Sequence, residues 1–553
     1  MLNVFRMIAV LWTLLPTVQG MDARAADLNQ ALNSISADSL KKHVAFLGND
    51  SLQGRGTGTP GGRLAAEYIA RQLAHWQFIP MGDNRSYFQS IPMHGSFPLP
   101  SSQMKIHSNT GEVDLRLKDD YLLYKSGAQT YIPRPQQLVF VGYGIIAPEF
   151  DYNDYQSLDV DGKIVVFLSG EPPSEDSTYF DGPYPTIYSY PESKQRIAIS
   201  RGASGSILIP RPVELVHEPW REWIQAFSFE DVTLAYSVTA NLSIALNPGA
   251  GEILFQNAPF TLRQVCELEK NNSMLSFPLE VSLSFKGEFT EREFFDRNVV
   301  GFLEGRMKRP NDSYLILSAH YDHLGIGEPV KGDSIYNGVG DNAIGVSALL
   351  ELARVFSLLP EKPLHNIIFL FTTGEEKGLL GSNYYIDHPI APLYKTIANV
   401  NIDGLSMFEK FEDVVGVGQE FSTLGDMLNR VAASRGLKVS PLPSQFLAME
   451  SFARSDQIAF AKAGIPSILI AEGLHFENST PQQALERIMH WSETYYHTPG
   501  DDLDQYINFE AAQHHCRFLY SFCHALASET LPPQWNSGTP YIMARLRSIA
   551  EKR

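Results

Sequence analysis

The second half of the sequence places histidines and acidic residues directly after several apolar runs of strand type. His320, the Glu375–Glu376 pair and Asp403 each follow such a run. Asp341 lies in a glycine-rich turn before a predicted helix, and His497 lies in a loop near the end of the chain. Because ligands of α/β sheets collect at the carboxyl ends of the strands, we expect these side chains to meet in one cleft.

A cleft of this composition requires a cation. Buried like charges cannot all stay ionised without one, and histidine nitrogen with carboxylate oxygen is a ligand set for zinc. Two divalent ions about 3.5–4 Å apart share a bridging carboxylate and a water molecule. Glu375 and Glu376 fit a division of labour, in which one binds metal and the other takes the proton of that water. Asp322, near His320, is expected either to hold the second ring N–H of that histidine or to serve another role in the site.

Each of these residues also has an ordinary structural interpretation. Asp341 is a candidate cap for the helix that follows it. The Glu375–Glu376 pair is a candidate helix start in solvent, and His497 is a candidate loop histidine. Finding all the ligand positions together in one chain favours the metal site over these separate explanations.

Other ionisable residues near these motifs are expected to stay outside the ligand set. We expect His323, His475 and His490 to contact the site from outside or to lie on the surface, and Asp501 and Asp502 to be surface charges. Asp456 and Glu472 are expected either to line the pocket or to belong to the framework.

Alternating strands and helices from Arg297 onward supply the frame for these residues. Strands are predicted at 298–303, 314–318, 366–372, 397–402 and 467–471, and helices at 345–358, 378–385 and 508–528. Alternation of this kind predicts an α/β fold with a mixed, mostly parallel sheet covered by helices on both faces.

The first part of the chain has a different pattern. Residues 27–47 and 63–76 have helical spacing of apolar residues. The glycine-rich run at 54–62 lacks the ending of a phosphate loop and is expected to be a flexible connection. Between about 89 and 291, short β-type runs alternate with turns and carry no cluster of histidines and acids. This β-rich segment is expected to have a covering or positioning role and to take no part in the chemistry.

Composition excludes several classes of protein. The chain has 553 residues, 44% of them hydrophobic, which excludes a disordered chain. The net charge of −18 argues against a nucleic-acid partner, since such proteins concentrate lysine and arginine on one face. Three cysteines are too few for a disulfide framework, and buried free thiols are expected.

The N-terminus is typical of a secretory signal. Met7 to Leu15 is an apolar run preceded by Arg6, and it is too short for the roughly 20 residues of a spanning helix. No other run is long and apolar enough to span a membrane. The protein is therefore expected to be secreted or periplasmic after removal of the signal. The sequence carries no indication of the oligomeric state.

Taken together, the motifs resemble those of metallopeptidase family 28, the co-catalytic di-zinc aminopeptidases. They are SAHYDHLG (318–325), GDNAIG (340–345), TGEEKGLLGS (373–382), NIDG (401–404), SD (455–456) with GIP (464–466), and YHTPGD (496–501). The region 47–67, with LQGRGTG, and the sequence SYFQ (86–89) also resemble the beginning of such enzymes.

The resemblance implies a role for each matched residue. It implies that His320 and Asp403 bind one zinc ion, that Glu376 and His497 bind the other, and that Asp341 bridges them. Glu375 is then the general base, and Asp322 orients His320. Tyr496 is expected either to donate a hydrogen bond to the developing oxyanion or to be a structural phenol. The peptide bond between Asp341 and Asn342 is often cis in this family.

A second resemblance concerns the middle of the chain. The sequences VGYG (141–144), DVDGKIVV (159–166) and RGASGSILI (201–209) are similar to the protease-associated domain that is often inserted in such enzymes. The expected organisation is a signal peptide at 1–25, an N-terminal part of the peptidase domain at 26–110, the inserted domain with flanking strands at 111–290, the zinc peptidase domain at 291–530 and a C-terminal tail at 531–553.

The leading functional hypothesis is a secreted zinc aminopeptidase that acts on the N-termini of peptides or proteins. A carboxypeptidase or dipeptidase of the same fold is the first alternative. A catalytically inactive, receptor-like ectodomain is the second, and the complete ligand set argues against it. A carboxypeptidase needs a basic pocket, and only Lys377 and Arg454 stand near the motifs, which favours the aminopeptidase.

Overall fold

The chain folds into two compact units. The computed structural model describes residues 29–125, 131–156, 158–176, 178–180, 186–212, 214–217, 219–237, 241–270, 272–443, 446 and 451–550. The predicted signal peptide lies outside these residues. Unit 1 comprises Met1–Ile91, Asp296–Leu442 and Phe452–Arg553, and unit 2 comprises Pro92–Phe295 and Pro443–Ser451. The chain passes between the units within the long strands β2 (Phe88–Pro98) and β14 (Phe289–Leu303).

Unit 1 is built on a mixed sheet with a parallel centre. Four neighbouring strands run parallel, and they are β18 (Asn366–Thr372), β15 (Tyr314–His320), β19 (Thr396–Asn401) and β22 (Ser467–Glu472). β14 pairs antiparallel with β18 on one side, and β20 (Asp413–Val417) pairs antiparallel with β22 on the other. β21 (Lys438–Val439) ends the sheet. The prediction of a mixed α/β sheet is confirmed, but the parallel pairs lie mainly in its centre and antiparallel pairs flank them on both sides.

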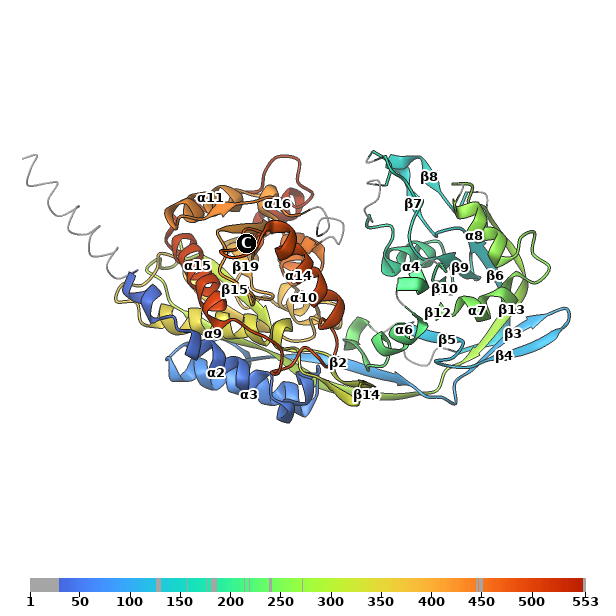
Figure 1. Cartoon of the computed structure of the whole chain (residues 1–553), viewed down its shortest axis with the longest axis horizontal. Coiled ribbons are helices and arrows are strands. Elements are labelled where there is room, and N and C mark those ends of the chain that lie inside the picture. Colours follow the sequence, from blue (N-terminus) through green and yellow to red (C-terminus); the bar gives the residue numbers. More distant parts are fainter. Residues whose placement is uncertain are drawn as a thin grey trace, which may run out of the picture. The chain divides into compact units, whose positions relative to one another are not determined.

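Helices cover both faces of this sheet because side chains along a buried strand alternate between its faces. Leu315 and Leu317 of β15 pack in one apolar cluster, and Ile316 packs in another. The first cluster includes residues of α2 (Ala37–Leu47), α3 (Pro60–His75), α9 (Ile344–Ser357), α11 (Leu424–Ser434) and α15 (Phe509–Ser528). The second includes residues of α10 (Leu380–Asp387) and α13 (Gln457–Lys462), and the layers can be followed in Figure 1.

The N-terminal region differs from its prediction in two places. The helix expected at 27–47 is interrupted at residues 35 and 36, where the Ser36 side chain caps α2 by accepting from the Ser39 N–H. The flexible connection expected at 54–62 is wrong. Residues Asp50–Arg55 form a 3-10 turn, Thr59 caps α3, and most of the glycine-rich run is buried.

Unit 2 is β-rich, as its sequence pattern predicts. Its eight-stranded sheet has the order β4-β3-β13-β6-β9-β10-β12-β5. The strands are β3 (Gln103–Ser108), β4 (Gly111–Leu115), β5 (Tyr121–Lys125), β6 (Tyr131–Val141), β9 (Ile164–Leu168), β10 (Gly205–Ile209), β12 (Leu242–Leu246) and β13 (Ser276–Lys286). The longer helices are α4 (Pro191–Ser200), α6 (Trp220–Ala226) and α8 (Leu262–Lys270).

The helix α16 (Ile542–Ala550) lies within the predicted C-terminal tail. All three cysteines are free thiols, as expected. Among the described residues, no helix combines the length and the apolar character needed to cross a membrane.

Candidate metal centre

Three strand ends, one turn and one loop of unit 1 bring the predicted ligands together. His320 is the last residue of β15, and Glu376 and Asp403 follow β18 and β19. Asp341 lies in the turn before α9, and His497 follows α14 (Pro481–Thr494). Since β18, β15 and β19 are parallel neighbours, their carboxyl ends lie at one edge of the sheet, as the general rule for such folds requires.

Asp341 joins two groups of ligand atoms. His320 Nε2 lies 3.2 Å from Asp341 Oδ1 and 3.2 Å from Asp403 Oδ1. On the other side, His497 Nε2 lies 3.2 Å from Asp341 Oδ2 and 3.1 Å from Glu376 Oε2. The two oxygens of one carboxylate therefore face two different histidines, which is the arrangement that a bridging ligand of two metal ions needs.

The donor set fits zinc on chemical grounds. Each group offers imidazole nitrogen and carboxylate oxygens, and the candidate ligand atoms of each group lie within 4.8 Å of one another. His497 Nε2 is buried and has no hydrogen-bond partner among the described residues, although two carboxylate oxygens lie near it. A buried ring nitrogen without a hydrogen-bond partner is suited to bind a cation together with these two carboxylates.

Glu375 lies beside the group that His320 forms with Asp341 and Asp403. It belongs to neither of the two histidine–carboxylate groups. One of its oxygens lies within 4.8 Å of candidate ligand atoms of His320 and Glu376. Burial raises the pKa of Glu375 well above its ordinary value, and Asp403, among the neighbouring carboxylates, adds to this rise. Burial also opposes ionisation of Glu376, but His497 and His323 outweigh it and hold the pKa of Glu376 below its ordinary value.

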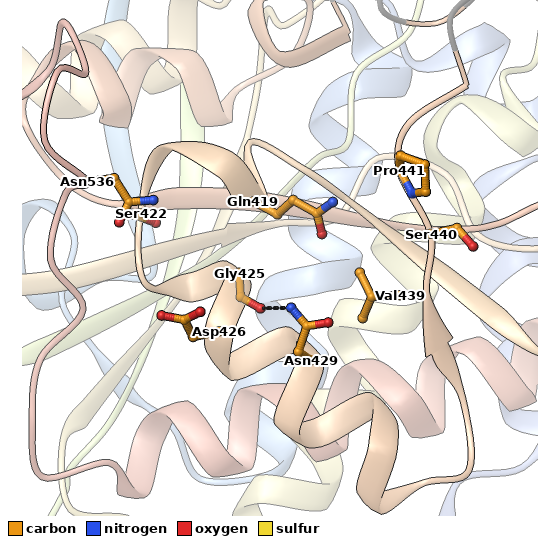
Figure 2. A pocket seen from close by; sticks show the side chains of 9 residues that line it. All are labelled: Gln419, Ser422, Gly425, Asp426, Asn429, Val439, Ser440, Pro441 and Asn536. Carbon is orange, nitrogen blue, oxygen red and sulfur yellow. Dashed lines mark hydrogen bonds between the residues drawn. The ribbon is translucent and has the colours of Figure 1, made fainter.

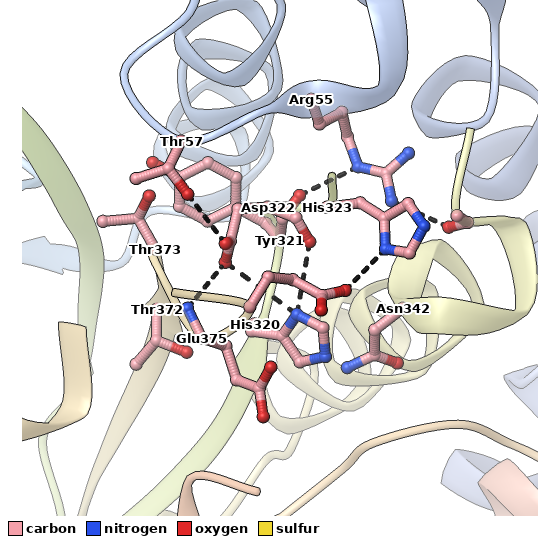
Figure 3. A network of polar contacts seen from close by, with 12 residues as sticks. Arg55, Thr57, His320, Tyr321, Asp322, His323, Asn342, Thr372, Thr373 and Glu375 are labelled. Carbon is pink, nitrogen blue, oxygen red and sulfur yellow. Dashed lines mark hydrogen bonds and ion pairs between the residues drawn. The ribbon is translucent and has the colours of Figure 1, made fainter. Parts of the chain in front are cut away.

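Asp322 contacts His320 mainly through its backbone (Figure 3). His320 Nδ1 lies 3.2 Å from the Asp322 carbonyl oxygen and 3.9 Å from its Oδ1. The Asp322 carboxylate accepts hydrogen bonds from Thr57 Oγ1 at 3.0 Å and from the Glu375 N–H at 3.2 Å. Burial raises the pKa of Asp322 to about 7. Asp322 thus ties the backbone of Glu375 to the strand that carries His320.

Asp501 corrects the prediction of a surface charge. Its side chain is fully buried, and its two oxygens accept from the Gly340 N–H at 2.7 Å and from the Asp341 N–H at 3.0 Å. Asp501 therefore holds the backbone of Asp341, the residue whose carboxylate faces both histidines. Its place at the end of the YHTPGD motif puts it near the ligands but does not indicate its backbone partners. The peptide bond that follows, Asp341–Asn342, is cis.

His323 is also closer to the centre than a surface histidine. It is fully buried, and its Nδ1 lies 2.6 Å from Glu376 Oε1. Together with Asp341, Glu376 and His497 it forms a four-residue group of candidate ligand atoms. The surface alternative for His323 is wrong, and its contact with Glu376 fits a residue that holds a ligand from outside.

Arg55 is a residue that the sequence analysis did not single out. Its guanidinium is fully buried and donates to four backbone carbonyls, as Figure 3 shows in part. The acceptors are the carbonyls of Tyr321 at 2.8 Å, Leu47 at 2.6 Å, Asn337 at 2.5 Å and Gly338 at 2.7 Å. One side chain thus connects the N-terminal region to the segment just after His320 and to the segment just before Asp341.

We expect Arg55→Met to lower the free energy of unfolding by about 3 kcal/mol or more, because it leaves buried carbonyls without donors. Urea unfolding in the presence of a chelator measures this separately from metal binding. Arg71→Met, on the exposed side of α3, is the matched control. Equal midpoints for the two variants would contradict the structural role of Arg55.

Tyr496 packs directly on a predicted ligand. Its ring stacks on the His497 ring with a centroid distance of 3.8 Å and an interplanar angle of 18°. Burial raises the pKa of Tyr496 well above its ordinary value, so the phenol keeps its proton at neutral pH.

A cavity of about 160 Å³ opens beside Asp403. Its walls come from Gly340, the loop after β19, the end of β22, α14 and α15, and the lining residues are Gly340, Asp403, Gly404, Leu405, Met407, Phe408, Ile470, Ala471, Glu472, Ile488, Trp491 and His515. A larger hollow of about 290 Å³ lies over α11 and β21 (Figure 2). Among the described residues that line this hollow, Asp426 is the one ionisable side chain, and none belongs to the ligand groups.

Residues 298–523 match the model of Peptidase family M28, and this segment contains every predicted ligand. This segment of the chain is therefore similar to the M28 peptidases. The chain is 28% identical over 239 residues to aminopeptidase YwaD of Bacillus subtilis, which covers 43% of this chain and 45% of YwaD. It is 32% identical over 158 residues to the vacuolar membrane protease of Saccharomyces cerevisiae, which covers 26% of this chain and 15% of that protein.

The chain therefore spans less than half the length of these curated relatives. Among solved structures, the aminopeptidase from Aneurinibacillus sp. strain AM-1 aligns with a TM-score of 0.54 at 18% identity, covering 90% of this chain and 95% of that one. This likeness shows a shared fold, in agreement with the mixed sheet and its helices.

Proposed function

We propose that the protein is a zinc-dependent aminopeptidase, which hydrolyses the first peptide bond of peptides or proteins. The observation that carries this proposal is the shared carboxylate of Asp341, whose two oxygens face His320 and His497. The M28 domain supports a peptidase, and the name of the relative YwaD supports an aminopeptidase.

Five residues are assigned to two zinc ions. His320 and Asp403 would hold one ion, Glu376 and His497 would hold the other, and Asp341 would bridge them. Bound at this place, zinc supplies a Lewis acid for the scissile carbonyl and lowers the pKa of water. The contacts of Asp501, His323 and Asp322 keep the ligands and Glu375 in place from outside, as is usual around metal sites.

Glu375 is assigned the proton transfers. Its carboxylate lies beside the first ligand group, and its backbone is fixed by Asp322. From there it accepts a proton from the attacking water and returns it to the leaving amine. Tyr496, held by stacking on His497, is assigned a hydrogen bond from its hydroxyl to the carbonyl oxygen as charge develops there.

The alternative functions have less support. A carboxypeptidase needs a cation to hold the free carboxylate of its substrate. Arg55, which is buried near the centre, directs its donors to backbone carbonyls and does not serve that purpose. An inactive ectodomain is disfavoured by the complete set of candidate ligands.

The proposal also covers unit 2 and the location of the protein. We assign unit 2 to a protease-associated domain, because the motifs that resemble that domain lie at the end of β6 and at the starts of β9 and β10. We assign the protein to the cell exterior or the periplasm, because an apolar run at Met7 to Leu15 follows Arg6.

We expect aminoacyl-p-nitroanilides to be cleaved and their N-acetylated forms to be left intact. Dialysis against a chelator should reduce the activity by at least about 100-fold, and added zinc should restore it, because loss of a metal-site contact alone costs about 10- to 100-fold. Initial rates at 405 nm measure all four conditions. Equal cleavage of blocked substrates, or activity that survives the chelator, would contradict the proposal.

A further inference from the structure

The cavity beside Asp403 combines apolar walls with a carboxylate. Met407, Phe408, Ile488 and Trp491 supply much of its apolar lining, and Glu472, the last residue of β22, lines it as well. The side chain of Glu472 is 15% exposed. An acidic residue in such a place either takes up a proton or is stabilised by a cationic partner, because burial of an unpaired charge is costly.

The nearest histidine does not provide that partner. His515 Nδ1 lies 3.8 Å from Glu472 Oε2, but this nitrogen accepts the Ser406 N–H at 3.0 Å. The other ring nitrogen, Nε2, lies 3.1 Å from the Ile470 carbonyl oxygen, which can only accept. The ring is therefore neutral with its proton on Nε2, and burial lowers the pKa of His515 to about 3.

The surroundings of Glu472 contain a like charge instead of a cation. Asp413 is buried on the neighbouring strand β20 and pairs with His475 at 2.7 Å. Burial, with a smaller contribution from Asp413, raises the pKa of Glu472 to about 7. Among the described residues, no lysine or arginine forms an ion pair with Glu472.

We propose that this cavity receives the side chain of the substrate's N-terminal residue and that Glu472 selects lysine or arginine there. The assignment rests on the proposed aminopeptidase function and concerns the same site, because Asp403 borders the cavity. The aliphatic stem of lysine or arginine matches the apolar walls, and its cationic end matches the carboxylate. A purely apolar side chain would leave Glu472 without a cationic partner.

The volume agrees with this assignment. A cavity of about 160 Å³ is comparable to cavities of about 150 Å³ that bind a small organic molecule such as benzene, so it has room for the side chain of one residue. The substrate's α-amino group alone would need neither this depth nor the apolar walls.

Lysine and norleucine p-nitroanilides test the assignment, because they share the aliphatic stem and differ in the terminal ammonium. We expect the wild-type protein to favour lysine in kcat/KM by about 10- to 100-fold, the range for one hydrogen bond to a charged group. Glu472→Gln should reduce this preference by a similar factor. Glu477→Gln is the matched control, because Glu477 is an exposed glutamate outside the cavity and should keep the preference.

Four results would overturn the assignment. A wild-type preference for norleucine would show that the carboxylate does not select a cation. Equal loss on both substrates in Glu472→Gln would show that Glu472 holds the α-amino group or the fold. If the wild-type protein cleaves neither substrate but cleaves other aminoacyl-p-nitroanilides, the assignment of the cavity fails and the aminopeptidase proposal stands. If it cleaves no aminoacyl-p-nitroanilide, both fail.

Discussion

Replacement of Glu375 by glutamine should lower kcat by about 10²–10⁴-fold and leave the metal content unchanged. The factor is that of one general acid–base group. Gln keeps the size of the side chain and one of its two oxygens but cannot carry a proton from water to the leaving amine. The backbone contact between the Glu375 N–H and Asp322 is independent of the substituted group. The predicted loss is therefore confined to turnover.

Two measurements separate this role from metal binding. Metal content per chain, determined by plasma mass spectrometry after dialysis, should match the wild-type value in Glu375→Gln. Glu376→Gln is the matched comparison and should lose metal, because Glu376 faces His497 at 3.1 Å. A third group of candidate ligand atoms includes Glu375 with His320 and Glu376. Metal loss in Glu375→Gln would therefore assign Glu375 to the ligands instead of to the base.

The part of the site that follows from local patterns was predictable. The predicted strand 366–372 coincides with β18, and the predicted strand 467–471 differs from β22 by one residue. Parallel strands bring their carboxyl ends to one edge, so residues just after them, such as His320 and Asp403, meet without further information. The resemblance then supplied a role for each position.

Residues whose partners are distant backbone groups were not predictable. Asp501 accepts from a backbone N–H 161 residues away, and Arg55 donates to a carbonyl 283 residues away. Backbone donors and acceptors are the same at every non-proline position, so nothing in the sequence indicates which of them a buried side chain will meet. Asp501 consequently seemed a surface charge, and the run around Arg55 seemed a flexible link.

Some elements were missed although a local signal existed. Helix α14 begins with a capping box, in which Thr480 and Gln483 bond to each other's backbone N–H groups. This pattern is readable from sequence. Strand β14 was predicted only over 298–303, because its first half, in unit 2, is largely polar and carries no apolar run. Its 15 residues became evident only from the pairing.

A graded loss of metal affinity is expected from three isosteric substitutions around the shared carboxylate. Asp341→Asn replaces one of the two oxygens that face His320 and His497 with an amide nitrogen, which does not bind zinc at neutral pH. We expect it to lower metal affinity by more than about 100-fold, since it removes a ligand and not only a contact to one.

Asp501→Asn should lower metal affinity by about 10- to 100-fold, because it weakens the two backbone hydrogen bonds that hold Gly340 and Asp341. Asp502→Asn, one residue further along, should leave affinity unchanged, since the Asp502 side chain accepts from the Asp504 N–H and touches no ligand. Competition with a zinc-binding dye gives all three constants, and circular dichroism checks the fold. Wild-type affinity for two ions in Asp341→Asn would rule out the bridge. Equal effects of Asp501→Asn and Asp502→Asn would show that Asp501 does not position it.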